Sequence, residues 1–161
     1  MQVQWAVQSH KYMLYNLSMP SYTVSLRISS RTLDTAQITR ELGLVPTQTR
    51  AAGERRSEHT VWDEAMWEFE VFPEGRHDWD SLESGLVALL KTFIPHTKTL
   101  QEYRDRYDVF VWCGQFSEGP GGFGGGPTLS AQVLKSLGNF GMRLELKAYL
   151  SDQKILKGLR P

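Results

Sequence analysis

Cysteine and long hydrophobic runs are what this sequence lacks most clearly. Cys113 is the only cysteine among 161 residues, so no disulfide can form within the chain, and the reducing cytoplasm is the expected setting. No stretch approaches the ~20 consecutive apolar residues of a membrane-spanning helix. The first 20 residues do not contain the continuous apolar segment of a secretory signal, because Lys11 interrupts their apolar sequence. We therefore expect a cytoplasmic protein that does not associate with membranes.

An excess of charge of one sign is also absent. Lysine and arginine together number 18, and aspartate and glutamate together number 18, so the formal net charge is zero. A protein that binds nucleic acids in general needs a surplus of basic residues to displace the counterions of the phosphates. The balance therefore argues against general nucleic-acid binding and leaves a local basic patch open.

Signatures of catalysis and of metal binding are missing from the sequence as well. The four histidines are scattered and do not have the spacing of paired metal ligands. No Gly-x-Ser-x-Gly turn is present, and Cys113 lies in an apolar segment where a buried, inert thiol is expected. We predict no catalytic residue, no metal site and no cofactor, and a binding domain rather than an enzyme.

Apolar residues are plentiful enough for a core. Hydrophobic residues make up 40% of the chain, with five Trp, six Tyr and seven Phe, and a chain of this length typically forms one domain. We divide it into an N-terminal arm (residues 1–20), a single α+β domain (21–150) and a basic C-terminal tail (151–161).

The N-terminal arm has the period of a β-strand. Val3, Trp5 and Val7 alternate with polar glutamines. Met13 and Met19 lie near the end of the arm, so it is either an edge strand or an extension from an upstream start. A lone strand needs a partner for its backbone groups, either its own sheet or a second chain. A homodimer formed through the arm is therefore one arrangement we expect.

Alternating apolar residues predict the strands of the domain. The segment 107–113 is apolar on both faces, which is typical of a central strand covered on both sides. In the last segment, the residues Leu144, Leu146, Ala148 and Leu150 form the face that we expect to point inward. The predicted strands cover residues 22–29, 61–62, 67–72, 107–113 and 143–150.

Helical spacing and capping residues predict three helices. The first begins at Asp34, with Gln37 as its capping-box partner, and ends at Gly43. The second covers residues 79–93 and is capped by Asp78, and the third runs from Ser130 to Gly138. Residues 96–105 form at most a helical turn, and residues 45–61 read as a polar, basic connection.

Two segments of the domain resemble each other. Each has a strand, then a leucine before a capping residue, and each helix closes on Leu-Gly. We predict a mainly antiparallel sheet with two or three helices packed on one face, built from two related strand–helix halves.

A set of short motifs recurs along the domain in a distinctive order. The motifs are Val24 to Ser29, Leu33-Asp34, Ile38, Leu42-Gly43-Leu44, Pro46 to Thr49, Gly53, Trp62, Leu129-Ser130, Leu134, Leu137 and the closing strand to Tyr149. Their order and spacing resemble a known family, the bacterial "domain of unknown function 4279". The resemblance covers about residues 22–150, and it implies this fold and a bacterial setting but no activity.

An arginine-rich loop is the best local candidate for a site. Arginine forks bind carboxylates and phosphates through two points, and a nearby tryptophan offers a stacking surface. The alternative is a solvated connection whose arginines pair with Glu54, Glu58 and Glu64, and on the next strand Glu68 and Glu70 are expected to contact solvent. The candidate binding residues are Arg50, Arg55, Arg56, His59, Trp62 and, on the central strand, Trp112.

Glycine is concentrated in one loop, residues 119–126, ahead of the third helix. Backbone amides at a helix start attract anions, but no Gly-Lys-Ser/Thr follows, so the loop is not a nucleotide P-loop. A plain loop connection is the other interpretation.

The sequence leaves two candidate functions open. The first is a protein-binding domain of a bacterial cytoplasmic protein, with an antidote-type interaction as one form, since Trp and Arg are favoured at interfaces. The second is a binder of a small anionic ligand or nucleotide that uses the arginine loop 50–59 and the glycine loop 119–126.

Overall fold

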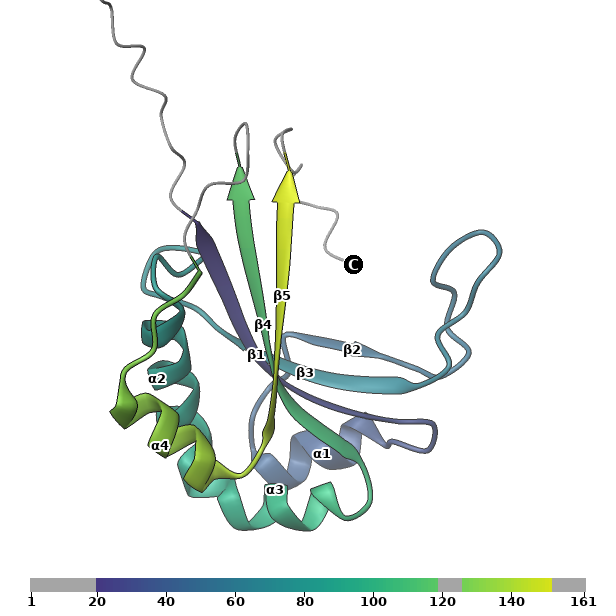
Figure 1. Ribbon diagram of the computed structural model, residues 1–161. Helices are drawn as coiled ribbons and strands as arrows, with labels where there is room; N and C mark the ends of the chain where they lie inside the picture. Colours follow the sequence, from purple (N-terminus) through teal and green to yellow (C-terminus); the bar gives the residue numbers. More distant parts are fainter. Residues whose placement is uncertain (1–19, 119–125, 152–161) are drawn as a thin grey trace, which may run out of the picture.

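A computed structural model describes residues 20–118 and 126–151 of the chain (Figure 1). The arm up to residue 19, most of the glycine loop and the tail beyond residue 151 lie outside the described residues. The sequence predictions for these three segments therefore stay predictions.

Five strands form one sheet in the order β2-β3-β1-β4-β5. All neighbouring strands are antiparallel except β4 and β5, which are parallel. The middle strand of the five is β1, and the predicted strand at 107–113 corresponds to the longer β4, which lies inside the sheet between β1 and β5. The strands are β1 (Ser21–Ser30), β2 (Gln48–Arg50), β3 (Ala65–Val71), β4 (Asp108–Glu118) and β5 (Arg143–Ser151).

Four α-helices lie on one side of the sheet (Figure 1), which confirms the predicted α+β class. A short 3₁₀ turn at Ile94–His96 joins α2 to α3. Among the described residues, no helix is long and apolar enough to cross a membrane. The helices are α1 (Thr35–Leu42), α2 (Leu82–Phe93), α3 (Thr97–Arg104) and α4 (Ala131–Phe140).

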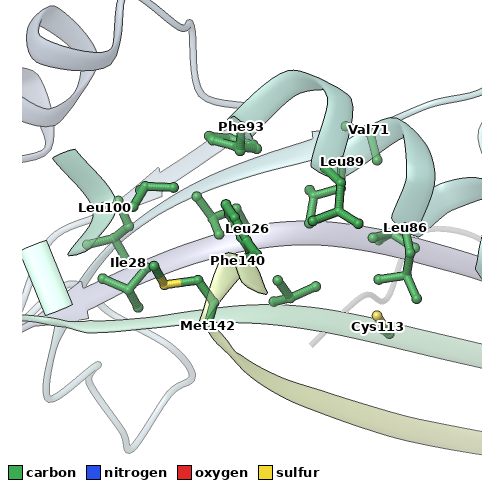
Figure 2. Close-up of a cluster of buried hydrophobic side chains, with 14 of the residues drawn as sticks. Leu26, Ile28, Val71, Leu86, Leu89, Phe93, Leu100, Cys113, Phe140 and Met142 are labelled. Atoms are coloured by element: carbon green, nitrogen blue, oxygen red, sulfur yellow. The ribbon is translucent and has the colours of Figure 1, made fainter. Parts of the chain in front are cut away.

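The hydrophobic core lies between the helices and β1 (Figure 2). Leu26 is fully buried and is paired in register with Phe69 of β3 and Val111 of β4. Gly85 lets α2 lie close to this strand, because a Cβ atom there would come within 2.6 Å of Cγ2 of Val24. The close approach allows the α2 side chains to cover the middle of the sheet.

The first helix follows its local signals. The side chain of Asp34 accepts hydrogen bonds from the amides of Ala36 and Gln37, and Gly43 ends the helix at φ 64°. These two observations confirm the predicted cap and stop. The capping box is not formed, because the Gln37 side chain donates to Glu41 instead.

Two helix boundaries were predicted wrongly. The cap of α2 is Ser81 rather than Asp78, because Trp79 is held in an extended bridge by two 2.8 Å backbone hydrogen bonds with Tyr22. The helix α4 continues through Gly138 and ends at Gly141, which has φ 74°. Val133 and Phe140 are the buried residues of α4, and Leu134 is exposed.

The sheet differs from the prediction in four respects. Residues 48–50 form the edge strand β2 inside the predicted connection, and Val61 makes only an isolated bridge to Arg55. The two proposed strand–helix halves are not equivalent in the sheet. The strand of the first half, β1, pairs antiparallel with β3, whereas the strand of the second half, β4, pairs parallel with β5. The inward-facing residues of β5 remain partly exposed, which is considered below.

Candidate functional site

The face of the sheet opposite the helices, called here the open face, carries an unusual set of buried polar residues. Alternation along β1 places Ser25 and Arg27 on this face, because Val24, Leu26 and Ile28 point into the core. Ser25 is only 1% exposed, Glu68 of β3 only 4% and Trp112 of β4 only 8%. Polar groups buried this deeply need partners.

Glu68 is the centre of this set. Its carboxylate accepts a hydrogen bond of 2.7 Å from the Ser25 hydroxyl and one of 2.9 Å from Nε of Arg27. The strand register places Arg27 directly opposite Glu68. The expectation that Glu68 contacts solvent was therefore wrong, because a cross-strand arginine binds it inside the protein.

Arg27 also stacks on a tryptophan. Its guanidinium carbon lies 4.0 Å from the centroid of the Trp112 ring, a cation–π distance. The indole Nε1 of Trp112 is buried and has no hydrogen-bond partner among the described residues. The predicted site residue Trp112 thus belongs to the Arg27–Glu68 cluster, which the sequence interpretation had not included.

The second arginine–tryptophan group is formed by the β2–β3 connection, which extends beyond the sheet in Figure 1. The guanidinium carbons of Arg50 and Arg56 lie 3.7 Å and 4.4 Å from the centroid of the Trp62 ring. Backbone hydrogen bonds between Gly53 and Trp62 (2.7 Å) and between Trp62 and Glu54 (2.9 Å) hold the base of the connection. The fold therefore brings three of the predicted site residues together.

The electrostatics indicate that the two groups are neighbours. Burial lowers the pKa of Arg50, and the positive charge of Arg27 lowers this pKa further, while Glu68 acts in the opposite direction. Nε of Arg50 is buried without a hydrogen-bond partner among the described residues. Arg50 is thus an incompletely neutralised cation beside the Arg27–Glu68 pair.

Two predicted site residues lie apart from this cluster. Arg55 donates to the backbone carbonyl of Glu58 at 3.3 Å, and the exposed His59 lies 3.9 Å from the Glu58 carboxylate. Among the described residues, neither of these two side chains lies over the Trp62 ring, which Arg50 and Arg56 cover.

The alternative interpretation of the loop, with arginines paired to nearby glutamates, is not what the structure contains. Glu54 accepts from the backbone amide of Ala51, and Glu64 accepts from the hydroxyl of Ser29. Among the described residues, Arg50 and Arg56 form no ion pair. The positive charges of these two arginines therefore have no carboxylate partner in this part of the chain.

An open hollow of about 480 Å³ lies at the end of β2. Its lining includes Arg31, Thr35, Thr49 and Arg50. Two cations and two hydroxyls around one hollow could hold a small anion, and the Glu54 carboxylate in the same lining would act against it. Neither Trp62 nor Trp112 lines this hollow, so it is separate from the ring faces described above.

No group of three or more His, Cys, Asp or Glu residues in the described ranges could hold a metal ion. Burial raises the pKa of the Cys113 thiol to about 12, so it stays protonated and unreactive at neutral pH. The open face carries the cations and ring faces described above instead.

Sequence reasoning missed Ser25, Arg27 and Glu68. The sequence does contain a signal for them. An arginine and a glutamate at the polar positions of two strands with alternating side chains are candidates for a cross-strand ion pair. Choosing this pair requires the register of β1 and β3, which depends on residues far apart along the chain.

Comparison with known proteins gives one finding on identity. The model of a domain of unknown function, DUF4279, matches residues 20–151. No curated protein and no solved structure matches the chain. The match covers most of the sequence and coincides with the region from β1 to β5. The chain therefore belongs to the DUF4279 family.

Proposed function

We propose that this chain is a non-enzymatic protein-binding domain that recognises an acidic segment of a partner protein. The binding surface consists of the open face around Arg27 and Trp112 together with Arg50, Arg56 and Trp62. We place it in the bacterial cytoplasm, where an antidote-type interaction with a toxin is one form that such binding takes.

The observation that carries this proposal is the stacking of Arg50 and Arg56 on Trp62 without an ion pair to any described residue. A guanidinium that lies over an indole is already oriented, so little side-chain entropy is lost when a carboxylate binds its N–H edge. Arginine and tryptophan are also the residues that most often dominate protein interfaces. A carboxylate on the partner would complete the missing pairs.

Adjacent arginines provide a matched test of this surface. The chain is used to capture its partner from the native cells, and the affinity of the purified pair is then measured by calorimetry. We expect Arg56→Gln to weaken binding by about tenfold or more. Arg55→Gln makes the same chemical change one residue away, where the side chain donates to the Glu58 carbonyl and does not stack on Trp62 in the described part of the chain, and should leave the affinity unchanged. Equal losses in the two variants would contradict the proposal.

A small anion is the second candidate ligand, favoured by the hollow beside Arg31 and Arg50. Inorganic phosphate and nucleotides are tested by thermal shift, since a ligand that binds only the folded state raises the melting temperature. A shift that Arg31→Gln abolishes supports this function. Because Arg31 is not part of the Trp62 stack, the same variant should still bind the protein partner, and the two functions can be distinguished.

A further inference from the structure

The two edges of the sheet differ greatly in length. At one edge, β2 has three residues. At the other, β5 has nine residues and pairs only with β4 among the described strands. A strand of nine residues presents a free edge roughly 30 Å long. Natural proteins rarely leave such an edge unpaired, because its N–H and C=O groups are a template for another strand.

The β5 side chains on the helix side of the sheet are apolar and uncovered. Leu144 and Leu146 pair in register with the buried Val111 and Cys113 of β4, yet they remain 39% and 45% exposed. Ala148 continues this row and is also exposed. Sequence alternation had placed the row inside the protein, so the structure leaves an apolar strip without its expected cover.

The β5 side chains on the open face alternate in charge. Arg143, Glu145 and Lys147 follow one another on this face. Arg143 pairs with Asp108 at 2.8 Å and with Glu145 at 3.1 Å, whereas Lys147 has no ion pair with any described residue. The strand therefore carries a carboxylate at Glu145 and, two residues later, an ammonium group at Lys147 that has no ion-pair partner among the described residues.

We propose that β5 pairs antiparallel with β5 of a second copy of this chain, with the two-fold axis passing at Leu146. In this register Leu146 lies opposite itself, and Leu144 lies opposite Ala148 of the other copy. Glu145 lies opposite Lys147, and this pair occurs twice because of the symmetry. The apolar strip and the alternating charges are both self-complementary in this arrangement.

Neighbouring registers are less favourable. An axis at Glu145 places two carboxylates opposite each other and Arg143 opposite Lys147. An axis at Lys147 places two ammonium groups opposite each other. Like charges directly opposite destabilise a strand pair, so the charge pattern disfavours these two registers, while the leucines and backbone hydrogen bonds supply most of the stability.

A charge-reversal cycle tests the pairing on the full chain. Sedimentation at a protein concentration on the order of 50 µM should give the mass of a dimer. Lys147→Glu puts a carboxylate opposite Glu145, and Glu145→Lys puts two ammonium groups opposite each other, so each single variant should weaken dimerisation at least tenfold. The double variant restores opposite charges and should restore the dimer. Lys135→Glu, at an exposed position of α4, is the matched control and should remain dimeric.

Cysteine cross-linking tests the register independently. Oxidised Leu146→Cys should form a covalent dimer, because directly opposite residues have Cβ atoms about 4.5–5.5 Å apart, close to disulfide geometry. Ala148→Cys should not, since two copies of residue 148 would lie roughly 13 Å apart in this register. Both variants are made with Cys113→Ala, because Cys113 lies beside residue 146 in the β4–β5 register and could otherwise form a disulfide within the chain.

Three results would overturn the inference: a monomeric native chain at that concentration, a dimer that both single charge variants leave intact, or equal cross-linking of the two cysteine variants. Melting curves for every variant separate loss of the dimer from loss of folding. A monomer would leave the leucine strip to the chain's own terminal segments or to another protein.

Discussion

Arg27 and Glu68 are 41 residues apart in the sequence and form a 2.9 Å ion pair inside the protein. The pair depends on the register of two strands, and the pair in turn disfavours any slip, because a shift of one residue would move the arginine to the core face. A buried polar pair of this kind contributes to the choice of one register even where its net stabilisation is small.

Removing the Glu68 carboxylate should destabilise the fold. Glu68→Ala leaves the guanidinium of Arg27 and the hydroxyl of Ser25 without their partner, and we expect a loss of about 2–4 kcal/mol in the free energy of unfolding. The measurement is chemical denaturation. Glu102→Ala, the same change at an exposed position of α3, should cost less than about 0.5 kcal/mol, and similar losses in both variants would contradict the buried role of Glu68.

Cys113 gives a prediction about pH. Burial raises the pKa of its thiol from 9.0 to about 12, so above about pH 9 the unfolded chain loses this proton while the folded chain keeps it. The unfolded state then binds fewer protons, and the contribution of Cys113 to stability should fall as the pH rises from about 9 to 12. Denaturation across this range measures the effect, and Cys113→Ala should remove it. An identical pH dependence in this variant would contradict the prediction.

Among the elements, local signals predicted α1 well because everything that defines it lies within ten residues. The capping oxygen of Asp34 and the left-handed Gly43 both act on the helix that lies between them. The boundaries that failed depend on distant contacts. Trp79 is extended because of its backbone bonds to Tyr22, and β2 forms because it lies against β3.

The short helix α3 shows the same limit. Only Leu100 and Tyr103 of its residues are buried, so its apolar period is too sparse to predict a helix from sequence. The helix is stabilised instead by the packing of Leu100 and Tyr103 in the hydrophobic core. In the candidate site, likewise, the loop residues around Trp62 were predicted from composition, whereas the cross-strand partners of Trp112 were not.

The end of α4 can be tested with two glycines three residues apart. Gly141 has φ 74°, and a Cβ atom there would lie 3.3 Å from Nη1 of Arg104, so Gly141→Ala should lower stability by about 1–2 kcal/mol. Gly138 lies inside the helix with open space around it, so Gly138→Ala should raise stability by about 0.5–1 kcal/mol. Thermal denaturation compares them, and opposite signs are expected. A destabilising Gly138→Ala would restore the helix end that the sequence had indicated.

For the whole molecule, the two faces of the sheet have separate roles. The helices cover one face and bury the core there, which leaves the open face for the arginine–tryptophan groups. The proposed β5 pairing would use a third surface, the edge, and the β2–β3 connection lies at the opposite end of the strand order. A dimer formed in this way would therefore keep both copies of the arginine surface accessible to partners.

Deleting residues 1–19 distinguishes the two ways in which this chain could form a dimer. The sequence predicts that the arm, with Val3, Trp5 and Val7 on one face, docks as an added strand, so its loss should lower the melting midpoint. If the β5 edges form the dimer, the truncated chain should nevertheless keep the mass of a dimer, and Lys147→Glu should dissociate it as it does the full chain. Sedimentation and melting of the truncated chain give both answers. A truncated monomer that melts at a lower temperature would mean that the arm itself is exchanged between copies, and an unchanged midpoint would mean that the arm adds no strand.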